Sequence, residues 1–331
     1  MSTSADTQSR IRACLAAFAC GDALGMATEF MTRADIARRF PGGVRDLLRA
    51  EDSQNHGDLV PGSVTDDTEQ VAYLMERYRS RGAVTVSDTV EGLLAWVRET
   101  GAVEKHYIGP SSLKALESIR KGTPAAEAGM GGTTCGGIMR TPSAFLWNTA
   151  QSEEELEENI LMSLLPTHNT SEALEAAGAY GFALRAAFNG AGMDKIFEAA
   201  ERGGKRLIAH ASWTGCAPGS VRRLLEARKL ARRLDENALL DHVYGLWGTG
   251  LPSADVCGAV FALFACAKKD VWKAIRLAAV IGGDTDTIAA LAGALSAAYA
   301  GGQNVPRPVL DKVLEQNREL FASKYQEALR A

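Results

Sequence analysis

Three short segments of the sequence concentrate carboxylates and threonine hydroxyls, and two of them lie directly before an apolar, helix-like run. They are residues 21–29 (GDALGMATE), 65–68 (TDDT) and 282–287 (GGDTDT). Asp66 and Asp67 are adjacent, so a regular helix would point them in different directions, whereas a turn that enters a helix can aim both at one point. Oxygen donors without His or Cys are typical ligands of Mg²⁺, Mn²⁺ or Ca²⁺ rather than Zn²⁺.

The last of these segments contains a second pair of acids. Asp284 and Asp286 are two positions apart, so an extended backbone would place both on one side, and the two preceding glycines free the chain for a turn. Helix capping also favours Thr and Asp and explains either segment alone equally well. Helix capping does not explain why the acidic pairs of residues 65–68 and 282–287 occur together with a third acidic segment. If the segments converge, their four carboxylates would repel one another without cations, and this charge would favour a pair of divalent ions about 3.5–4 Å apart.

The elements that would position these acids are predicted to be helices. Apolar residues at helical spacing recur along the chain, alanine is frequent, and no convincing strand alternation occurs. We therefore expect one all-α domain over residues 1–331. The first helix is expected around residues 11–19, with Gly21 interrupting it. Further helices are predicted over residues 69–81, 87–98, 111–120, 151–165, 171–189, 193–202, 220–234, 253–268, 271–280, 288–300 and 308–320, followed by a C-terminal helical stretch.

Composition excludes several functional classes. The chain has 331 residues and a net charge of -4, which argues against a general nucleic-acid binder because such a protein needs a basic face. The apolar runs are shorter than the ~20 residues of a membrane span, the N-terminal segment is polar, and the six cysteines form no CxxC pair. We expect a cytoplasmic protein with reduced thiols, a monomer or small homo-oligomer, without nucleic-acid or membrane partners.

The three acidic segments, in this order and spacing, resemble the ADP-ribosylglycohydrolases, which include dinitrogenase-reductase-activating glycohydrolases and ADP-ribosylhydrolases. Weaker similarity continues through residues 109–111, 131–140, 166–168 and Pro252, so it covers nearly the whole chain. The resemblance implies a compact orthogonal multi-helix fold and a centre of two Mg²⁺ or Mn²⁺ ions. It places the metal ligands at Thr65, Asp66, Asp67, Asp284, Asp286 and Thr287.

The same resemblance assigns catalytic roles near the metals. Glu29 matches an acidic residue of the family that takes part in catalysis. A water molecule activated by a metal, by Glu29 or by Asp67 would attack the anomeric carbon of a ribose, through a transition state that resembles an oxocarbenium ion. Asp22 is expected to be structural and to bond local backbone amides.

A glycine-rich segment, residues 131–137, predicts a substrate loop. Its backbone N–H groups can cradle an anion, and the matching loop of the family holds the diphosphate of ADP-ribose. A plain connecting loop would need most of the same glycines. Where the family often has Asn, this chain has Cys135. A cysteine nucleophile has no His or acid nearby in sequence to activate it. The resemblance also places His168 near the ribose, with backbone bonding as the alternative. The expected substrate contacts are Gly131, Gly132, Thr133, Thr134, Gly136, Gly137, Met139 and His168.

The function expected from these residues is metal-dependent hydrolysis of an N- or O-glycosidic bond to ribose. The default substrate is an ADP-ribosylated protein, with arginine as the modified side chain, and the alternative is a small nucleoside or related ribosyl metabolite, which the changed loop favours. A non-catalytic ADP-ribose-binding or crystallin-like protein is the alternative of another class, and the presence of every acidic position argues against it. A dinuclear phosphatase would require His ligands beside the acids, and the motifs contain none.

Overall fold

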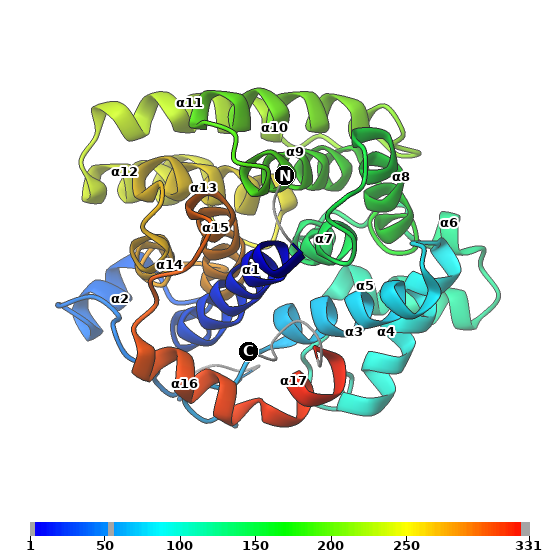
Figure 1. Cartoon of the computed structure of the whole chain (residues 1–331), viewed down its shortest axis with the longest axis horizontal. Helices are drawn as coiled ribbons and strands as arrows, with labels where there is room; N and C mark the ends of the chain where they lie inside the picture. The colour runs from blue at the N-terminus through cyan, green and yellow to red at the C-terminus, as the bar shows by residue number, and fades with distance from the viewer. Residues whose placement is uncertain (1–3, 52–55, 326–331) are drawn as a thin grey trace.

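A computed structural model describes residues 4–51 and 56–325, and within them the fold is all-α, as the sequence predicts (Figure 1). The described chain forms seventeen α-helices and no β-strand; a single isolated bridge joins Thr134 to Pro252. The helices are α1 (Ser4–Gly25), α2 (Arg33–Arg39), α3 (Asp66–Arg81), α4 (Val86–Thr100), α5 (Pro110–Arg120), α6 (Ala125–Ala128), α7 (Gly136–Leu146), α8 (Glu153–Leu164), α9 (Ser171–Phe188), α10 (Met193–Ile208), α11 (Ser220–Arg233), α12 (Glu236–His242), α13 (Ser253–Ala267), α14 (Val271–Ala278), α15 (Thr285–Ala300), α16 (Arg307–Gln316) and α17 (Arg318–Lys324), with a 3₁₀ turn at Met26–Thr28 and a π-helical turn at Val243–Trp247.

Helices α1 and α15 form the centre of the molecule. They pack along each other, with α13 and α14 also against α15, and Figure 1 shows α9, α10 and α11 on one side and α16 and α17 on the opposite side. The expected break at Gly21 is wrong, because α1 continues to Gly25. A Cβ on Gly21 would lie 2.4 Å from the Ala289 carbonyl oxygen, so this glycine permits a close helix contact. The stretch Ala5–Thr28 is long and apolar enough to cross a membrane, but 89% of its apolar window is buried inside the fold.

Replacing Gly21 with alanine tests this contact. Alanine is the better helix former, but the obstructing atoms belong to the backbone of α15, so no side chain can move aside and the helices must separate. We expect the free energy of unfolding in urea to fall by about 1–3 kcal/mol. Gly42→Ala is the matched control, because nothing lies within 4 Å of its added Cβ. If the two variants were equally stable, Gly21 would not be required for the close approach of α1 and α15.

Helices α3 and α15 begin three residues earlier than predicted, at Asp66 instead of residue 69 and at Thr285 instead of residue 288. The acidic residues therefore occupy the first helical turns or the position directly before them, where the helix dipole favours negative charge. Helix α7 lies outside all predicted ranges, since two glycines at its start and an internal Pro142 give no helical signal. Its burial against α3, α8 and α9 overrides this poor propensity. Helices α2, α6 and α12 were also not predicted, and residues 326–331 of the expected C-terminal helix lie outside the described residues.

Candidate metal and substrate site

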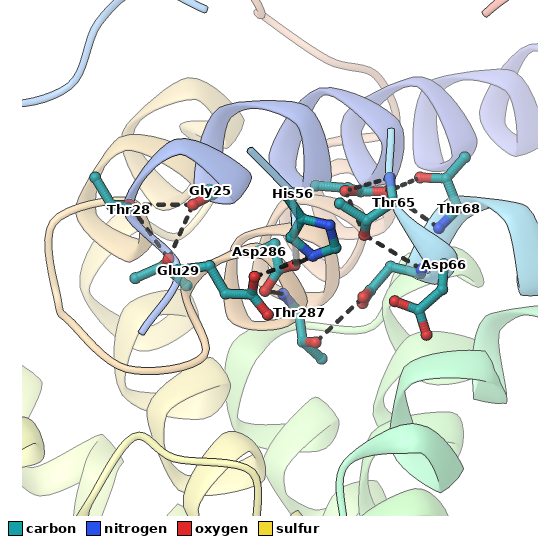
Figure 2. A network of polar contacts seen from close by, with 12 residues as sticks. Gly25, Thr28, Glu29, His56, Thr65, Asp66, Thr68, Asp286 and Thr287 are labelled. Carbon is teal, nitrogen blue, oxygen red and sulfur yellow. Dashed lines mark hydrogen bonds and ion pairs between the residues drawn. The ribbon is translucent and has the colours of Figure 1, made fainter. Parts of the chain in front are cut away.

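The three acidic motifs meet at one cavity, where α1 ends and α3 and α15 begin (Figure 2). The cavity has a volume of about 240 Å³. Segments that are far apart in the sequence form the walls of this cavity, and nine of the predicted site residues line it. They are Glu29, Asp66, Asp67, Thr134, Gly136, Met139, Asp284, Asp286 and Thr287.

Asp22 holds the TDDT turn in place. This fully buried carboxylate accepts hydrogen bonds from the backbone N–H of Thr65 at 3.0 Å and of Thr68 at 3.1 Å, and from both threonine hydroxyls. The structural role predicted for Asp22 agrees with this arrangement. Its partners, however, are 43 and 46 positions away along the chain rather than local, because Asp22 lies inside α1.

The predicted ligands on α3 differ in where their oxygens lie. The hydroxyl of Thr65 donates to Asp22 Oδ1 at 2.9 Å and accepts from the backbone N–H of Asp67, so this residue caps α3 and does not line the cavity. Asp66 accepts a hydrogen bond from the Gln70 amide at 2.8 Å. Asp67 Oδ2 accepts from the Thr287 hydroxyl at 3.3 Å, which joins the first turn of α3 to that of α15.

The start of α15 is anchored on both sides. Gly282 and Gly283 have φ angles of 88° and 81°, and a Cβ on Gly283 would lie 2.2 Å from the Thr249 carbonyl oxygen. Thr285 donates its hydroxyl to the Gly25 carbonyl at 2.9 Å, which ties α15 to the end of α1. Asp284 is the residue before α15 and Asp286 is in its first turn. Both line the cavity, although the segment is not extended as the sequence argument assumed.

His56 is a site residue that the sequence reasoning missed. Its Nε2 lies 3.0 Å from Glu29 Oε2 and 3.9 Å from Asp286 Oδ2, and its ring packs edge-on against Tyr107 with centroids 5.2 Å apart. Burial alone would lower the pKa of His56, but the hydrogen bond and negative charge of Glu29 outweigh it and raise that pKa. A single His in a loop without motif or periodicity gives no signal in the sequence.

The electrostatics of the cavity fit a divalent cation. Asp67 Oδ1 and Asp284 Oδ2 are buried and have no hydrogen-bond partner among the described residues. No Lys or Arg from the described part of the chain lines the cavity. Ligand atoms of Glu29, His56 and Asp286 lie within 4.8 Å of one another. Burial and the neighbouring negative charges raise the pKa of Asp67, Asp284 and Asp286, to about 6 for Asp284. Bound cations would favour the ionised form of these carboxyls.

These shifts predict how pH and Mg²⁺ act on stability. A carboxyl whose pKa is higher in the folded chain than its unfolded value of about 4 stabilises the fold most at low pH, and this contribution is lost as pH rises through the raised pKa. Metal-free protein should therefore melt at a lower temperature at about pH 8 than at about pH 5. Mg²⁺ binds the ionised carboxylates, so it should raise Tm by several degrees at about pH 8 and little at about pH 5. Scanning calorimetry measures both, and an equal Mg²⁺ effect at the two pH values would contradict the assignment.

The glycine-rich segment packs against residues 164–168 and also contributes to the cavity wall. A Cβ on Gly132 would lie 2.0 Å from the Thr167 carbonyl oxygen, and one on Gly137 would contact Leu164 and His168. Gly131 and Gly132 line a smaller neighbouring cavity of about 160 Å³. Three further predicted substrate contacts line neither of the two cavities: Thr133, Gly137 and His168.

Cys135 lies at the wall of the main cavity, which Asp284 also lines. Burial and the nearby Asp284 raise the pKa of this thiol well above its usual value. A neutral thiol is a weak nucleophile, which agrees with the sequence argument against covalent catalysis by Cys135.

Comparison with known proteins identifies the class. The family described as ADP-ribosylglycohydrolase matches residues 3–330. The chain is 27% identical over 325 residues to the uncharacterised protein YegU of Escherichia coli (strain K12), covering 97% of this chain and 96% of YegU. It is 25% identical over 316 residues to ADP-ribosylarginine hydrolase Tri1 of Serratia proteamaculans (strain 568), covering 93% and 76%. A solved structure titled "ADP-ribosylglycohydrolase-related protein complex" shares the fold, with a TM-score of 0.67, 24% identity and coverage of 98% and 100%.

The all-helical fold and the family match thus place the protein in the glycohydrolase class. The chain belongs to the ADP-ribosylglycohydrolase family. Membership supports a hydrolase activity, and the family is generally metal-dependent. The predicted resemblance is confirmed.

Proposed function

We propose that this protein is a metal-dependent hydrolase that cleaves the glycosidic bond between a ribose and its leaving group. The observation that carries the proposal is the meeting of three acidic motifs at one cavity, with buried carboxylate oxygens that have no hydrogen-bond partner among the described residues. A crystallin-like or purely binding protein has no need of such carboxylates, which repel one another in the absence of cations.

The predicted ligands can hold two Mg²⁺ or Mn²⁺ ions. Asp66, Asp67, Asp284, Asp286 and Thr287 present oxygens to the cavity, and carboxylate and hydroxyl oxygens suit these cations. When bound, the ions would supply Lewis-acid polarisation and orientation of the ribose hydroxyls. Thr65 caps α3 and positions Asp67.

Glu29 is the general base of the proposed reaction. It lines the cavity and forms an ion pair with His56 Nε2 at 3.0 Å. Glu29 would take a proton from water as the water oxygen forms a bond to the anomeric carbon, while the bond from that carbon to the leaving group breaks and its electron pair leaves with that group. The surrounding carboxylates would stabilise the positive charge that develops on the ribose ring in an oxocarbenium-like transition state.

An ADP-ribosylated arginine is the first substrate candidate. The Serratia relative is named an ADP-ribosylarginine hydrolase and covers 93% of this chain. A guanidinium leaving group also needs little acid assistance, and the cavity offers no Lys or Arg from the described chain as a general acid.

The size of the cavity favours a second candidate. Its volume of about 240 Å³ is below the ~300–1,000 Å³ of typical ligand sites. Cys135 at its wall replaces the family's usual Asn. A small nucleoside or related ribosyl metabolite, cleaved by the same residues, would fit this space without the adjoining cavity beside Gly131 and Gly132.

Calorimetric titration of ADP-ribose into metal-stripped, Mg²⁺-reloaded protein tests the choice. Asp284→Ala removes one predicted ligand, and Asp311→Asn is the control because Asp311 is an exposed acid on α16. Mg²⁺-dependent binding that is lost in Asp284→Ala and kept in Asp311→Asn supports ADP-ribosyl substrates. No binding by folded, Mg²⁺-loaded protein would exclude them and leave the small ribosyl metabolites.

A further inference from the structure

Arg140 is a buried cation without a carboxylate partner. It is fully buried in α7, and no salt bridge to it occurs among the residues that the structure describes. Its guanidinium donates to the Gly136 carbonyl at 2.9 Å, to the Ser163 carbonyl at 3.3 Å and to the Thr167 hydroxyl. Burial lowers the pKa of Arg140 to about 10, so it remains protonated near neutral pH.

The charge of Arg140 is connected to His168. The Nδ1 atom of this fully buried imidazole lies 3.3 Å from an Arg140 nitrogen and 2.8 Å from the Thr167 hydroxyl. Guanidinium groups only donate, so Thr167 accepts from Arg140 and directs its own hydrogen to His168 Nδ1. Burial beside Arg140 also lowers the pKa of His168 well below its usual value, so the ring is neutral.

A neutral imidazole that accepts at Nδ1 carries its hydrogen on Nε2. That atom lies 3.0 Å from Thr134 Oγ1. The side chain of His168 packs closely on two glycines, since a Cβ added to Gly136 would lie 3.0 Å from the ring atom Cε1 and one added to Gly137 would lie 3.2 Å from the His168 Cβ. The Thr134 oxygen therefore accepts from His168, and its own hydrogen must point elsewhere.

We propose that the chain of hydrogen bonds from Arg140 through Thr167 and His168 makes the Thr134 hydroxyl an obligatory donor into the main cavity. Thr134 lines that cavity, and His168 is the one hydrogen-bond partner of its hydroxyl among the described residues. The substrate atom at Thr134 must then be a hydrogen-bond acceptor and not an N–H group. His168 is a positioning residue: it orients Thr134 and does not itself line the cavity.

This donor complements the rest of the wall. Glu29 and the four aspartates of the motifs present acceptor oxygens once they are ionised. The Thr134 hydroxyl, near the start of α7, supplies a donor and therefore determines the orientation of a bound ribosyl group. The orientation of the ribosyl group rests on the proposed hydrolase function, whereas the tautomer of His168 is independent of that function.

Nitrogen NMR of protein labelled with ¹⁵N-histidine tests the chain directly. We expect one imidazole with hydrogen on Nε2 only, unchanged between about pH 5.5 and about pH 8, since burial beside Arg140 lowers the pKa of His168 and favours its neutral form. Loss of the signal in His168→Gln assigns it. If that variant fails to fold, the signal that shifts in Thr134→Val provides the assignment, because only His168 loses an acceptor. An Nδ1–H tautomer or an imidazolium in this range would overturn the inference.

A pair of variants tests the donor with substrate. Thr134→Val keeps the shape and removes the hydroxyl, while Thr134→Ser keeps the hydroxyl. We expect kcat/KM for a ribosyl substrate to fall about ten-fold in Thr134→Val and to stay within about two-fold in Thr134→Ser. Equal activity of the two variants would overturn the donor role. If wild-type protein cleaves no ribosyl substrate, the proposed function fails while the NMR result still decides the state of His168.

Discussion

Replacing Asp286 with asparagine should abolish turnover while leaving the protein folded. Asp286 is buried in the first turn of α15 beside Glu29, Asp67 and Asp284, which raise its pKa together with burial. Asparagine keeps the volume but removes the charge that a cation needs. Metal catalysis contributes several kcal/mol, so kcat/KM should fall at least about a thousand-fold.

Stability separates this result from simple unfolding. Because the substitution removes a buried like charge, metal-free Asp286→Asn should be as stable as metal-free wild type, or more stable, at about pH 8. It should also lose the increase in Tm that Mg²⁺ gives the wild type. Asp311→Asn should behave as wild type in both assays. Retention of Mg²⁺ stabilisation and of turnover in Asp286→Asn would remove this residue from the metal site.

The second large effect is expected for Glu29→Gln. The carboxylate of Glu29 lines the cavity and has His56 Nε2 at 3.0 Å. Glutamine preserves its shape but cannot accept a proton, so kcat should fall by about 10²–10⁴. KM and Mg²⁺ stabilisation should change little, because Asp67, Asp284 and Asp286 remain.

The same variant decides between the two bases that the sequence leaves open. If Asp67 were the base, Glu29→Gln would retain nearly full kcat. His56→Gln serves as the companion variant: its amide can still donate to Glu29, so its loss of kcat should be smaller than that of Glu29→Gln. A larger loss in His56→Gln than in Glu29→Gln would indicate that the imidazole acts on substrate or metal itself.

Most of the fold was predictable because its helices bury regular apolar stripes. The range 87–98 predicted from leucines and valines corresponds to α4 (Val86–Thr100), and residues 253–268 correspond to α13 (Ser253–Ala267). Helix α7 was not predictable in the same way. Gly136, Gly137 and Pro142 are poor helix formers, and the helix exists because three others bury it. The same limit applies to Gly21, which signals a helix end locally but serves a helix contact.

The acidic motifs were predicted to converge, and the structure brings them to one cavity. The exact positions of their residues were not predicted. The first turn of α3 depends on capping by Thr65, and the start of α15 depends on the hydrogen bond from Thr285 to the Gly25 carbonyl of α1. The partners of Asp22 and the place of His56 depend on contacts between segments far apart in the chain. Local sequence pattern carries no information about such contacts.

Metal-dependent cleavage of a bond to ribose can be measured as product release with and without Mg²⁺. The rates at which the protein releases ADP-ribose from ADP-ribosylated arginine, and free base from a set of nucleosides, should be compared in Mg²⁺ and after chelation. We expect turnover of at least one of these substrates in Mg²⁺, a loss of at least about a thousand-fold on chelation, and recovery when Mg²⁺ is restored. Turnover that is unaffected by chelation, or no turnover of any ribosyl substrate by folded, Mg²⁺-loaded protein, would contradict it.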